Sequence, residues 1–443
     1  MKNLKTEKIS KLFFKYTIPS IIGSLAIGML IFIDTIFIGR NIGAYGLASL
    51  SILWPVFTLY NSLGLLIAVG AGANATLELS RGNTENRNKI FTLAIHLALI
   101  ISITLLIVQT IFLDKIILLL GADTLVFEYV KSYGKILSLF APFYILPHIL
   151  NIFTSNDNNP KIAMWGMLLC SITNILLDYI FIVKLNMGMM GASLATAFAQ
   201  VSYFMILFSH FFKKENTLKI VKISLDKNQV EKIIKTGLPS FLDDISLGLG
   251  VFIFNLILLK KASTLHVSAL SIIINIQCLI FLFFVGLSQG CQPIISMNYG
   301  SNLFNRVKKI NKLALIVSIL MSFIIIKVFL SYSREIALLF IKDDIHLLEL
   351  MVEAIPIFFL GTLFMGINLY YIYFFQVTEK SGRSVKLLAI RLISLIIGII
   401  FIPMLSTIDK IWYASLFSEG ITLIFLIIIV KKENYNCSKL VRI

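Results

Sequence analysis

The chain has 443 residues, of which 58% are hydrophobic and only 14% are charged, and its formal net charge is +16. A soluble domain has about half apolar and about a quarter charged residues, so this composition excludes an ordinary soluble domain and indicates a polytopic membrane protein. The basic residues lie in short loops, and no soluble basic module is long enough to bind nucleic acid. Three of the four cysteines lie in apolar stretches, so no disulfide framework is implied.

Twelve apolar stretches, each about the length that crosses a bilayer, follow one another along the chain. They cover roughly 14–38, 47–72, 90–113, 127–153, 162–183, 190–212, 236–259, 266–296, 311–331, 347–376, 385–404 and 410–430. The first is too long for a signal-peptide core, so we expect it to be retained. The sequence therefore predicts an all-α protein with twelve transmembrane helices.

Lysine and arginine gather in the loops of one side. These loops carry, among others, Lys2, Lys5, Lys8, Lys11 and Lys15; Arg81, Arg87 and Lys89; Lys213, Lys214, Lys219, Lys222, Lys227, Lys232 and Lys235; and Arg306, Lys308, Lys309 and Lys312. The opposite loops hold only scattered charges. By the positive-inside rule, both termini are predicted to be cytoplasmic, which requires an even number of spans.

The second half of the chain repeats the first at an offset of about 220 residues. Ile18-Pro19-Ser20 recurs as Leu238-Pro239-Ser240, and we expect both prolines to allow local bends. Each repeat holds six spans, and an even number gives both the same orientation, so we predict two six-helix lobes with pseudo-two-fold symmetry about the membrane normal. The predicted N-lobe is 1–212, the cytoplasmic linker is 213–235 and the C-lobe is 236–443.

One acidic residue lies inside the first span. Asp34 is preceded by Ile31, Phe32 and Ile33 and followed by Thr35-Ile36-Phe37-Ile38. An acid at the centre of a spanning helix costs about 2.5–3.5 kcal/mol, so such a residue is expected to face the bundle interior or an aqueous cavity and to serve function.

Two further spans of the N-lobe carry polar pairs at helical spacing. Asn174 and Asp178 lie four residues apart in span 5, and Thr196 and Gln200 lie four apart in span 6. Carboxylate, amide and hydroxyl oxygens are the ligands of a hard cation such as Na⁺. Two close carboxylates also favour binding of a proton, because both cannot stay ionised. These residues also have purely structural interpretations. Asp178 would then be a solvated carboxylate at the end of its helix, and the Thr196 hydroxyl would hydrogen-bond within its own helix.

The C-lobe offers a second group of candidate residues. Arg391 in span 11 and Glu419 in span 12 are both ionisable and are expected to pair; alternatively, Arg391 extends its side chain towards the cytoplasm. Asn255 in span 7 and Asn275 in span 8 either line a cavity or form interhelical hydrogen bonds.

Four sequence stretches resemble those of multidrug and toxic compound extrusion (MATE) transporters, in the bacterial multidrug-efflux and DNA-damage-inducible branch. They are Ile33-Asp34-Thr35-Ile36-Phe37-Ile38-Gly39, Asn174-Ile175-Leu176-Leu177-Asp178, Gly191-Ala192-Ser193-Leu194-Ala195-Thr196, and GLSQGCQPIISMNYG from Gly286 to Gly300. The resemblance implies export of cationic or amphipathic organic compounds, driven by inward movement of Na⁺ or H⁺. It also implies a coupling-ion site at Asp34, Asn174, Asp178 and Thr196.

The C-lobe departs from the pattern of some relatives, which carry an acid in the middle of span 7. The repeat places Phe254 where Asp34 stands in the N-lobe, and the acids of span 7, Asp243 and Asp244, come about ten residues earlier, roughly 15 Å along a helix. The coupling ion is therefore predicted in the N-lobe. Aromatic residues of span 10, including Tyr370, Tyr371, Tyr373, Phe374 and Phe375, either contact flat organic cations or face the lipid or the core.

The alternative function is a lipid or lipid-linked oligosaccharide flippase of the same superfamily, which needs cationic residues around its cavity to meet a pyrophosphate; Arg391 is the single convincing arginine within a span. An enzyme is not expected, because the spans carry no catalytic motif. We expect no cofactor other than the coupling ion, and we expect the protein to function as a monomer. Its expected partners are small organic cations and membrane lipids, and its expected location is the bacterial inner membrane.

Overall fold

The computed structural model describes residues 2–122, 124–223, 226–261, 264–340 and 345–440, and the regular secondary structure of this part of the chain is all helical, with no strand. The N-lobe contains α1 (Lys2–Thr6), α2 (Ile9–Asn41), α3 (Ala44–Ser80), α4 (Thr84–Leu119), α5 (Phe127–Leu139), α6 (Ala141–Asn156), α7 (Pro160–Asp178) and α8 (Gly188–Phe208). The C-lobe contains α9 (Lys227–Lys261), α10 (Thr264–Gly300), α11 (Phe304–Ser331), α12 (Ser333–Leu338), α13 (Ile345–Phe359), α14 (Thr362–Val377), α15 (Ser381–Leu405) and α16 (Ala414–Leu440). The predicted all-α class is confirmed.

Within the described residues, ten helices are long and apolar enough to cross a membrane, and two bent helix pairs raise this number to twelve. The pairs are α5 with α6, bent by 51°, and α13 with α14, bent by 44°. They correspond to the predicted spans 127–153 and 347–376, so the expected number of spans is reached. The two broken spans are the fourth of each lobe, as the repeat requires.

The sharp bends do not fall at the prolines that the sequence singles out. Both Pro19 and Pro239 lie inside continuous helices, α2 and α9. The first break falls at Phe140, because Pro142 has no N–H to continue the helix from α5. The second falls next to Gly361, where a Cβ would lie 3.0 Å from the backbone carbonyl carbon of Ser415, so glycine favours the close approach of α16.

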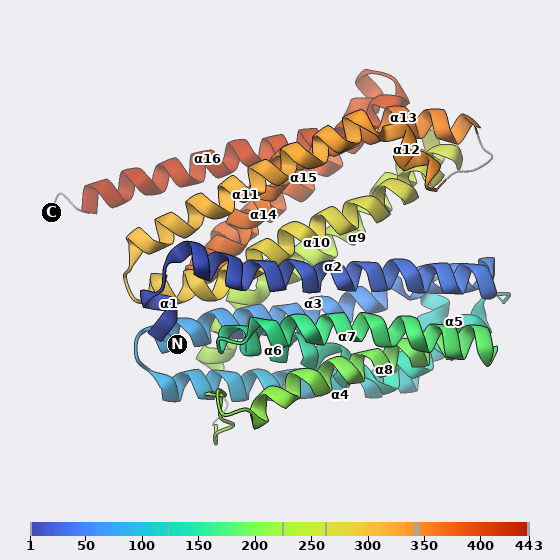
Figure 1. Cartoon of the computed structure of the whole chain (residues 1–443). Coiled ribbons are helices and arrows are strands. Elements are labelled where there is room, and N and C mark those ends of the chain that lie inside the picture. Colours follow the sequence, from blue (N-terminus) through green and yellow to red (C-terminus); the bar gives the residue numbers. More distant parts are fainter. Residues whose placement is uncertain (1, 123, 224–225, 262–263, 341–344, 441–443) are drawn as a thin grey trace.

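The two lobes lie one above the other in Figure 1 and converge at the end where α2 begins. There α3 packs on α9, and α2 packs on α10. Glycines allow the backbones to come close: a Cβ on Gly237 of α9 would lie 1.8 Å from the carbonyl oxygen of Leu66, and one on Gly290 of α10 would lie 2.6 Å from Thr17 Cα. The lobes are therefore in tight contact on the side of the N-terminus.

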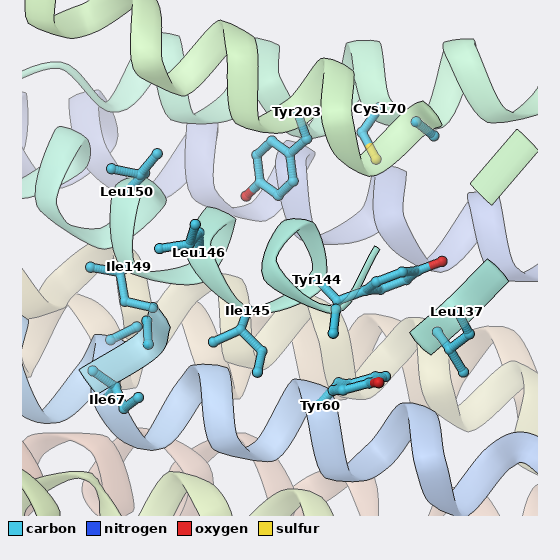
Figure 2. Packing of buried hydrophobic residues seen from close by; sticks show 14 of the residues in the cluster. Tyr60, Ile67, Leu137, Tyr144, Ile145, Leu146, Ile149, Leu150, Cys170 and Tyr203 are labelled. Atoms are coloured by element: carbon cyan, nitrogen blue, oxygen red, sulfur yellow. The ribbon is translucent and has the colours of Figure 1, made fainter. Parts of the chain in front are cut away.

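The core of the N-lobe combines aliphatic side chains with buried tyrosines (Figure 2). The rings of Tyr60 on α3 and Tyr144 on α6 are stacked, with centroids 5.8 Å apart and planes inclined by 16°. A tyrosine in an apolar core needs a partner for its hydroxyl group. Tyr60 Oη donates to Gln109 Oε1 at 2.5 Å, whereas Tyr144 Oη has no partner among the described atoms.

The predicted linker is partly helical, because α9 begins at Lys227. Its first half is fastened to the N-lobe through Asp157, which follows α6. The Asp157 carboxylate accepts hydrogen bonds from Arg87 Nη2 at 2.7 Å, His210 Nε2 at 2.8 Å and the Thr217 N–H at 2.9 Å. Residues 224–225, also within the predicted linker, lie outside the described part of the chain.

Candidate functional site

Asp34 lies on α2 and faces the interior of the N-lobe. Its side chain is only 8% exposed, and its Oδ1 atom has no hydrogen-bond donor among the described residues. The helix is predominantly apolar around it, so no neighbour in the sequence offsets the charge. The structure thus places this acid away from lipid, as its cost in a bilayer requires.

The partner of Asp34 is Asp178, the last residue of α7. The two carboxyl groups interact directly, and both are buried. Neither Asp178 oxygen accepts a hydrogen bond from an N–H or O–H group of the described residues. Since two adjacent carboxylates cannot both remain ionised without compensation, this pair requires a proton or a cation.

Asn174 and Thr196 complete the predicted set. Asn174 lies one turn before Asp178 and donates through Nδ2 to Thr196 Oγ1 of α8 at 3.4 Å. Thr196 Oγ1 in turn donates to the Ala192 carbonyl at 3.1 Å, and Asn174 Oδ1 has no partner among the described atoms. The structure therefore brings all four predicted residues into one cluster, which we call the N-lobe site: Asp34, Asn174, Asp178 and Thr196.

The N-lobe site presents unsatisfied oxygen atoms. Asp34 Oδ1, Asn174 Oδ1 and both Asp178 carboxylate oxygens are buried without a donor from the described part of the chain. Such an all-oxygen set suits a small hard cation, and the carboxyl pair equally suits a proton. Within the described residues no group of three or more His, Cys, Asp or Glu side chains could hold a metal ion, so a cation at this site would depend on the Asn174 and Thr196 oxygens beside the two carboxyl groups. The residues fit Na⁺ or H⁺.

Two tyrosines at this site were not anticipated from the sequence. Tyr133 on α5 donates to Thr196 Oγ1 at 3.4 Å, and Tyr144 on α6 is close enough to Asp34 to interact electrostatically. Both pack against Phe57 of α3, with ring centroids 5.6 and 6.2 Å away. A tyrosine within an apolar span is the only signal of this role in the sequence, because its hydroxyl must find a polar partner when buried.

The helix widens directly after Asp178. Residues Tyr179–Lys184 form a π-helical turn that continues α7. Single π turns inside α-helices are rare and are frequent at functional sites. Here the turn adjoins one of the two carboxyl groups of the N-lobe site.

The remaining predicted amides are placed elsewhere. Gln200 is half-buried on α8, one turn beyond Thr196. Asn255 on α9 is half-buried, and its Oδ1 atom lacks a donor among the described residues. Asn275 is exposed, and its Nδ2 bonds to the Ser271 carbonyl of its own helix at 2.9 Å.

In the C-lobe, Arg391 and Glu419 come together with an acid from a third helix. Arg391 of α15 donates through Nε to Glu419 Oε1 of α16 at 2.8 Å and through Nη1 to Asp243 Oδ1 of α9 at 3.1 Å. Asn368 of α14 donates to Glu419 Oε2 at 2.7 Å. We call Asp243, Asn368, Arg391 and Glu419 the C-lobe cluster. The pairing of Arg391 within the bundle replaces the alternative in which it extends to the cytoplasm.

The position that the repeat equates with Asp34 is part of an apolar core. Phe254 is 3% exposed, and its ring stacks on Trp412 with centroids 5.9 Å apart. The charged residues of the two lobes are therefore not equivalent by position. The aromatic residues of span 10 are mostly core as well, since Tyr370, Tyr373 and Phe375 are at most 4% exposed.

Comparison with known proteins identifies relatives over nearly the whole chain. The MatE family model matches residues 19–180 and again 239–404, one match in each half. The multidrug export protein MepA of Staphylococcus aureus (strain MSSA476) is 27% identical over 398 residues, covering 89% of this chain and 87% of the relative. MepA of Staphylococcus haemolyticus (strain JCSC1435) is 26% identical over 396 residues, with the same coverage.

Solved structures share the fold. A multidrug resistance MATE family transporter of the MOP superfamily, in its outward-facing conformation, superimposes with a TM-score of 0.93 at 19% identity, covering 99% of this chain and 98% of that one. A MOP superfamily transporter from Pyrococcus furiosus, whose binding pocket is described as having reverse polarity, gives a TM-score of 0.88 at 20% identity, covering 96% and 95%. The twelve-span, two-lobe architecture and the resemblance seen in the sequence are thereby confirmed. The chain is a multi-pass membrane protein and belongs to the MatE family of transporters.

Proposed function

We propose that this protein exports cationic or amphipathic organic compounds by antiport with Na⁺ or H⁺, through alternating access between its two lobes. The observation that carries the proposal is the Asp34–Asp178 pair, two interacting carboxyl groups in which Asp34 Oδ1 and both Asp178 oxygens are buried without a donor among the described residues. Such a pair binds a proton or a cation and responds to its loss with electrostatic repulsion. The MepA relatives are named as multidrug export proteins, in accord with the proposed substrates.

Coupling requires that the bound ion changes the equilibrium between two conformational states of the transporter. An ion shifts a conformational equilibrium only through its differential affinity for those states. The N-lobe site joins α2, α7 and α8, and α2 also packs on α10 of the other lobe. Ion arrival at Asp34 and Asp178 removes repulsion between α2 and α7, and α2 transmits the change to the interface between the lobes.

Lobe packing supports alternating access. The lobes are in contact through glycines on the side of the N-terminus, and the ribbons separate towards the opposite end (Figure 1). With both termini in the cytoplasm of a bacterial cell, as the charge distribution favours, this state is closed to the cytoplasm. The inner membrane is then the proposed location, and a single chain holds both lobes of the pathway.

The alternative, a flippase of pyrophosphate-linked lipids, is less well supported. Its main candidate for binding a diphosphate, Arg391, forms ion pairs with both Asp243 and Glu419 inside the C-lobe. A guanidinium held by two carboxylates is not available to an anionic headgroup. The buried acids of both lobes instead favour a cationic substrate.

The test is ethidium efflux from energised cells that express Asp34→Asn. The amide cannot take up a proton or balance a cation, so efflux is expected to fall to the level of cells without the transporter. Asp114→Asn is the matched control, because Asp114 is an exposed acid on α4 that pairs with Lys131 at 2.9 Å. Unchanged efflux by Asp34→Asn at equal expression would exclude the proposed role of this residue.

A further inference from the structure

We propose that residues 4–7 form a latch that keeps the lobes closed on the proposed cytoplasmic side, and that Arg306 of the C-lobe holds this latch in place. The inference rests on the transport function proposed above, because it names a contact that must be released when the lobes part on this side. The latch precedes α2 of the N-lobe in the chain, but it docks on the C-lobe. It lies at the end of the molecule where the two lobes converge (Figure 1).

The apolar part of the latch is Leu4. Its side chain is 0% exposed and belongs to a hydrophobic cluster that includes Ile294 of α10 and Val307 of α11. Removal of a leucine side chain from water favours the docked segment over an undocked one. The latch is therefore attached to the C-lobe, although the chain continues from it directly into the first span of the N-lobe.

The polar part of the latch is its backbone, which the C-lobe binds through two side chains. Arg306, in the first turn of α11, donates through Nη2 to the Glu7 carbonyl at 2.7 Å and to the Leu4 carbonyl at 3.2 Å. Asn298 of α10 is fully buried and donates to the same Leu4 carbonyl at 3.1 Å. It also accepts a hydrogen bond from Arg306 Nε at 2.8 Å, which fixes the orientation of the guanidinium.

The latch also contacts the N-lobe, at the end of α3. Lys5 Nζ donates to the carbonyl of Ser80, the last residue of α3, at 3.0 Å. A positive charge is favourable at the C-terminus of a helix. The Ser301 hydroxyl of the C-lobe donates to the same carbonyl at 3.4 Å, and a Cβ on Gly300 would lie 1.9 Å from Ser80 Oγ. The latch therefore bridges the ends of α3 and α10 where these two helices already meet.

The internal repeat contains a corresponding contact in the N-lobe. The offset of about 220 residues matches Arg306 to Arg87, which lies in the first turn of α4. Arg87 Nη1 donates to the carbonyl of Thr217 at 3.4 Å, in the segment that leads into α9. In each lobe, an arginine at the start of the third span thus binds the segment that precedes the first span of the other lobe.

The two arginines differ in how firmly they hold these segments. Arg87 is 5% exposed and pairs with the Asp157 carboxylate at 2.7 Å, and such a buried ion pair is costly to break. Arg306 is half-buried, and its hydrogen bonds to the described residues all go to neutral oxygens. The contact of Arg306 is therefore the one that is released, while the contact of Arg87 keeps the linker attached to the N-lobe.

The rate at which a buried cysteine reacts with a water-soluble maleimide measures how often the structure around it opens. Thr17→Cys reports on the lobe contact, because Thr17 is 1% exposed and its Cα would lie 2.6 Å from a Cβ on Gly290 of α10. Cys170 reports on the interior of the N-lobe, where it is fully buried. The full-length protein in lipid nanodiscs carries these two cysteines and no other, and peptide mass spectrometry measures both rates.

Arg306→Ala removes both hydrogen bonds from the guanidinium to the latch. It is expected to raise the reaction rate of Thr17→Cys by roughly tenfold or more and to leave that of Cys170 unchanged. Lys308→Ala is the matched control, because it removes the same charge from an exposed position of the same helix. Equal rates in Arg306→Ala and Lys308→Ala would overturn the proposal. Equal acceleration at Cys170 would also overturn it, because the effect would then be a general loss of structure.

Leu4→Ser weakens the latch from its apolar side and is expected to accelerate the reaction of Thr17→Cys as well. Leu4→Ser/Arg306→Ala should react no faster than the faster single variant, because either change already undocks the same segment. Effects that multiply in the double variant would contradict a single latch. The labelling needs no substrate. Accelerated labelling without ethidium efflux by the wild type would therefore refute only the proposed function, and unchanged labelling with normal efflux would refute only the latch.

Discussion

At the scale of single residues, the two lobes meet the cost of buried charge in different ways. The N-lobe pair, Asp34 and Asp178, has no counter-charge among the described residues and needs an ion from outside. The C-lobe acids share Arg391. Breaking a buried pair by removing one partner costs about 3–5 kcal/mol, so such arrangements persist only where every charge is accounted for.

The same reasoning applies to Asp157 outside the membrane. Burial raises the pKa of this carboxyl, but hydrogen bonds from His210 and Thr217 and the charge of Arg87 outweigh burial, so its pKa lies below the ordinary 3.8. The stabilisation is therefore fully present above pH 3.8 and is lost as pH falls through the lowered pKa. Asp157→Asn is expected to lower the free energy of unfolding by about 3–5 kcal/mol at neutral pH, since it leaves Arg87 unpaired.

Thermal unfolding in detergent between pH 7 and pH 3 checks this prediction. The difference in Tm between wild type and Asp157→Asn should be constant down to about pH 5 and then shrink in acid. A difference that grows as the pH falls would show that Asp157 is not held in its ionised form.

The residues of the N-lobe site were largely predictable, because an acid in an apolar span and polar pairs four residues apart leave few alternatives. The structure shows them together, whereas Tyr133 and Asp243 were not assigned. Tyrosine is common in apolar spans, and the sequence does not show which side of α5 faces Thr196. Asp243 does not occupy the position that the repeat equates with Asp34, which is Phe254. Its partners Arg391 and Glu419 come from helices that are distant in sequence, so their contact with Asp243 could not be predicted.

At the scale of helices, contact between the lobes depends on glycines at the crossing of α3 and α9. A Cβ on Gly237 would lie 1.8 Å from the Leu66 carbonyl oxygen, whereas one on Gly248 of the same helix would have no atom within 4 Å. Gly237→Ala is expected to cost about 1–3 kcal/mol through overpacking and to reduce transport. Gly248→Ala should be neutral or stabilising, because alanine favours a helix by about 1 kcal/mol over glycine.

Thermal unfolding and ethidium efflux of these two variants, compared at equal expression, provide the measurement. Equal behaviour of Gly237→Ala and Gly248→Ala would show that the close approach of α3 and α9 is not required.

The apolar part of each span was predictable from its length, but neither the ends of the helices, which run beyond it, nor the position of the bends was predictable. Proline marks a bend only where the missing hydrogen bond is not compensated, and α2 and α9 continue through Pro19 and Pro239. The breaks in the fourth span of each lobe depend on tertiary contact, as at Gly361 against Ser415. Such contacts are not visible in a local sequence pattern.

At the scale of the whole molecule, alternating access requires the lobes to separate on the side of the N-terminus. There Asn74 of α3 donates to Thr236 of α9 at 3.3 Å, and Arg81 pairs with Glu379 across the lobes at 3.2 Å. Cysteines at positions 74 and 236 joined by a short thiol crosslinker should hold the lobes together and abolish ethidium efflux, and reductive cleavage of the linker should restore it.

The two variants that carry only one of the introduced cysteines, treated with the same reagent, control for reaction with the native cysteines Cys170, Cys278, Cys291 and Cys437. Full efflux from a completely crosslinked protein would contradict alternating access by separation of the lobes.

The central claim is that an ion bound at Asp34 drives export of an organic cation. Its most direct test is ethidium transport in proteoliposomes, first with an imposed Na⁺ gradient at fixed pH and then with a pH gradient in the absence of Na⁺. The account predicts that at least one gradient drives transport by the wild type and by Asp114→Asn, and that neither drives it in Asp34→Asn. Transport by Asp34→Asn at the wild-type rate, or no response of the wild type to either gradient, would contradict the account.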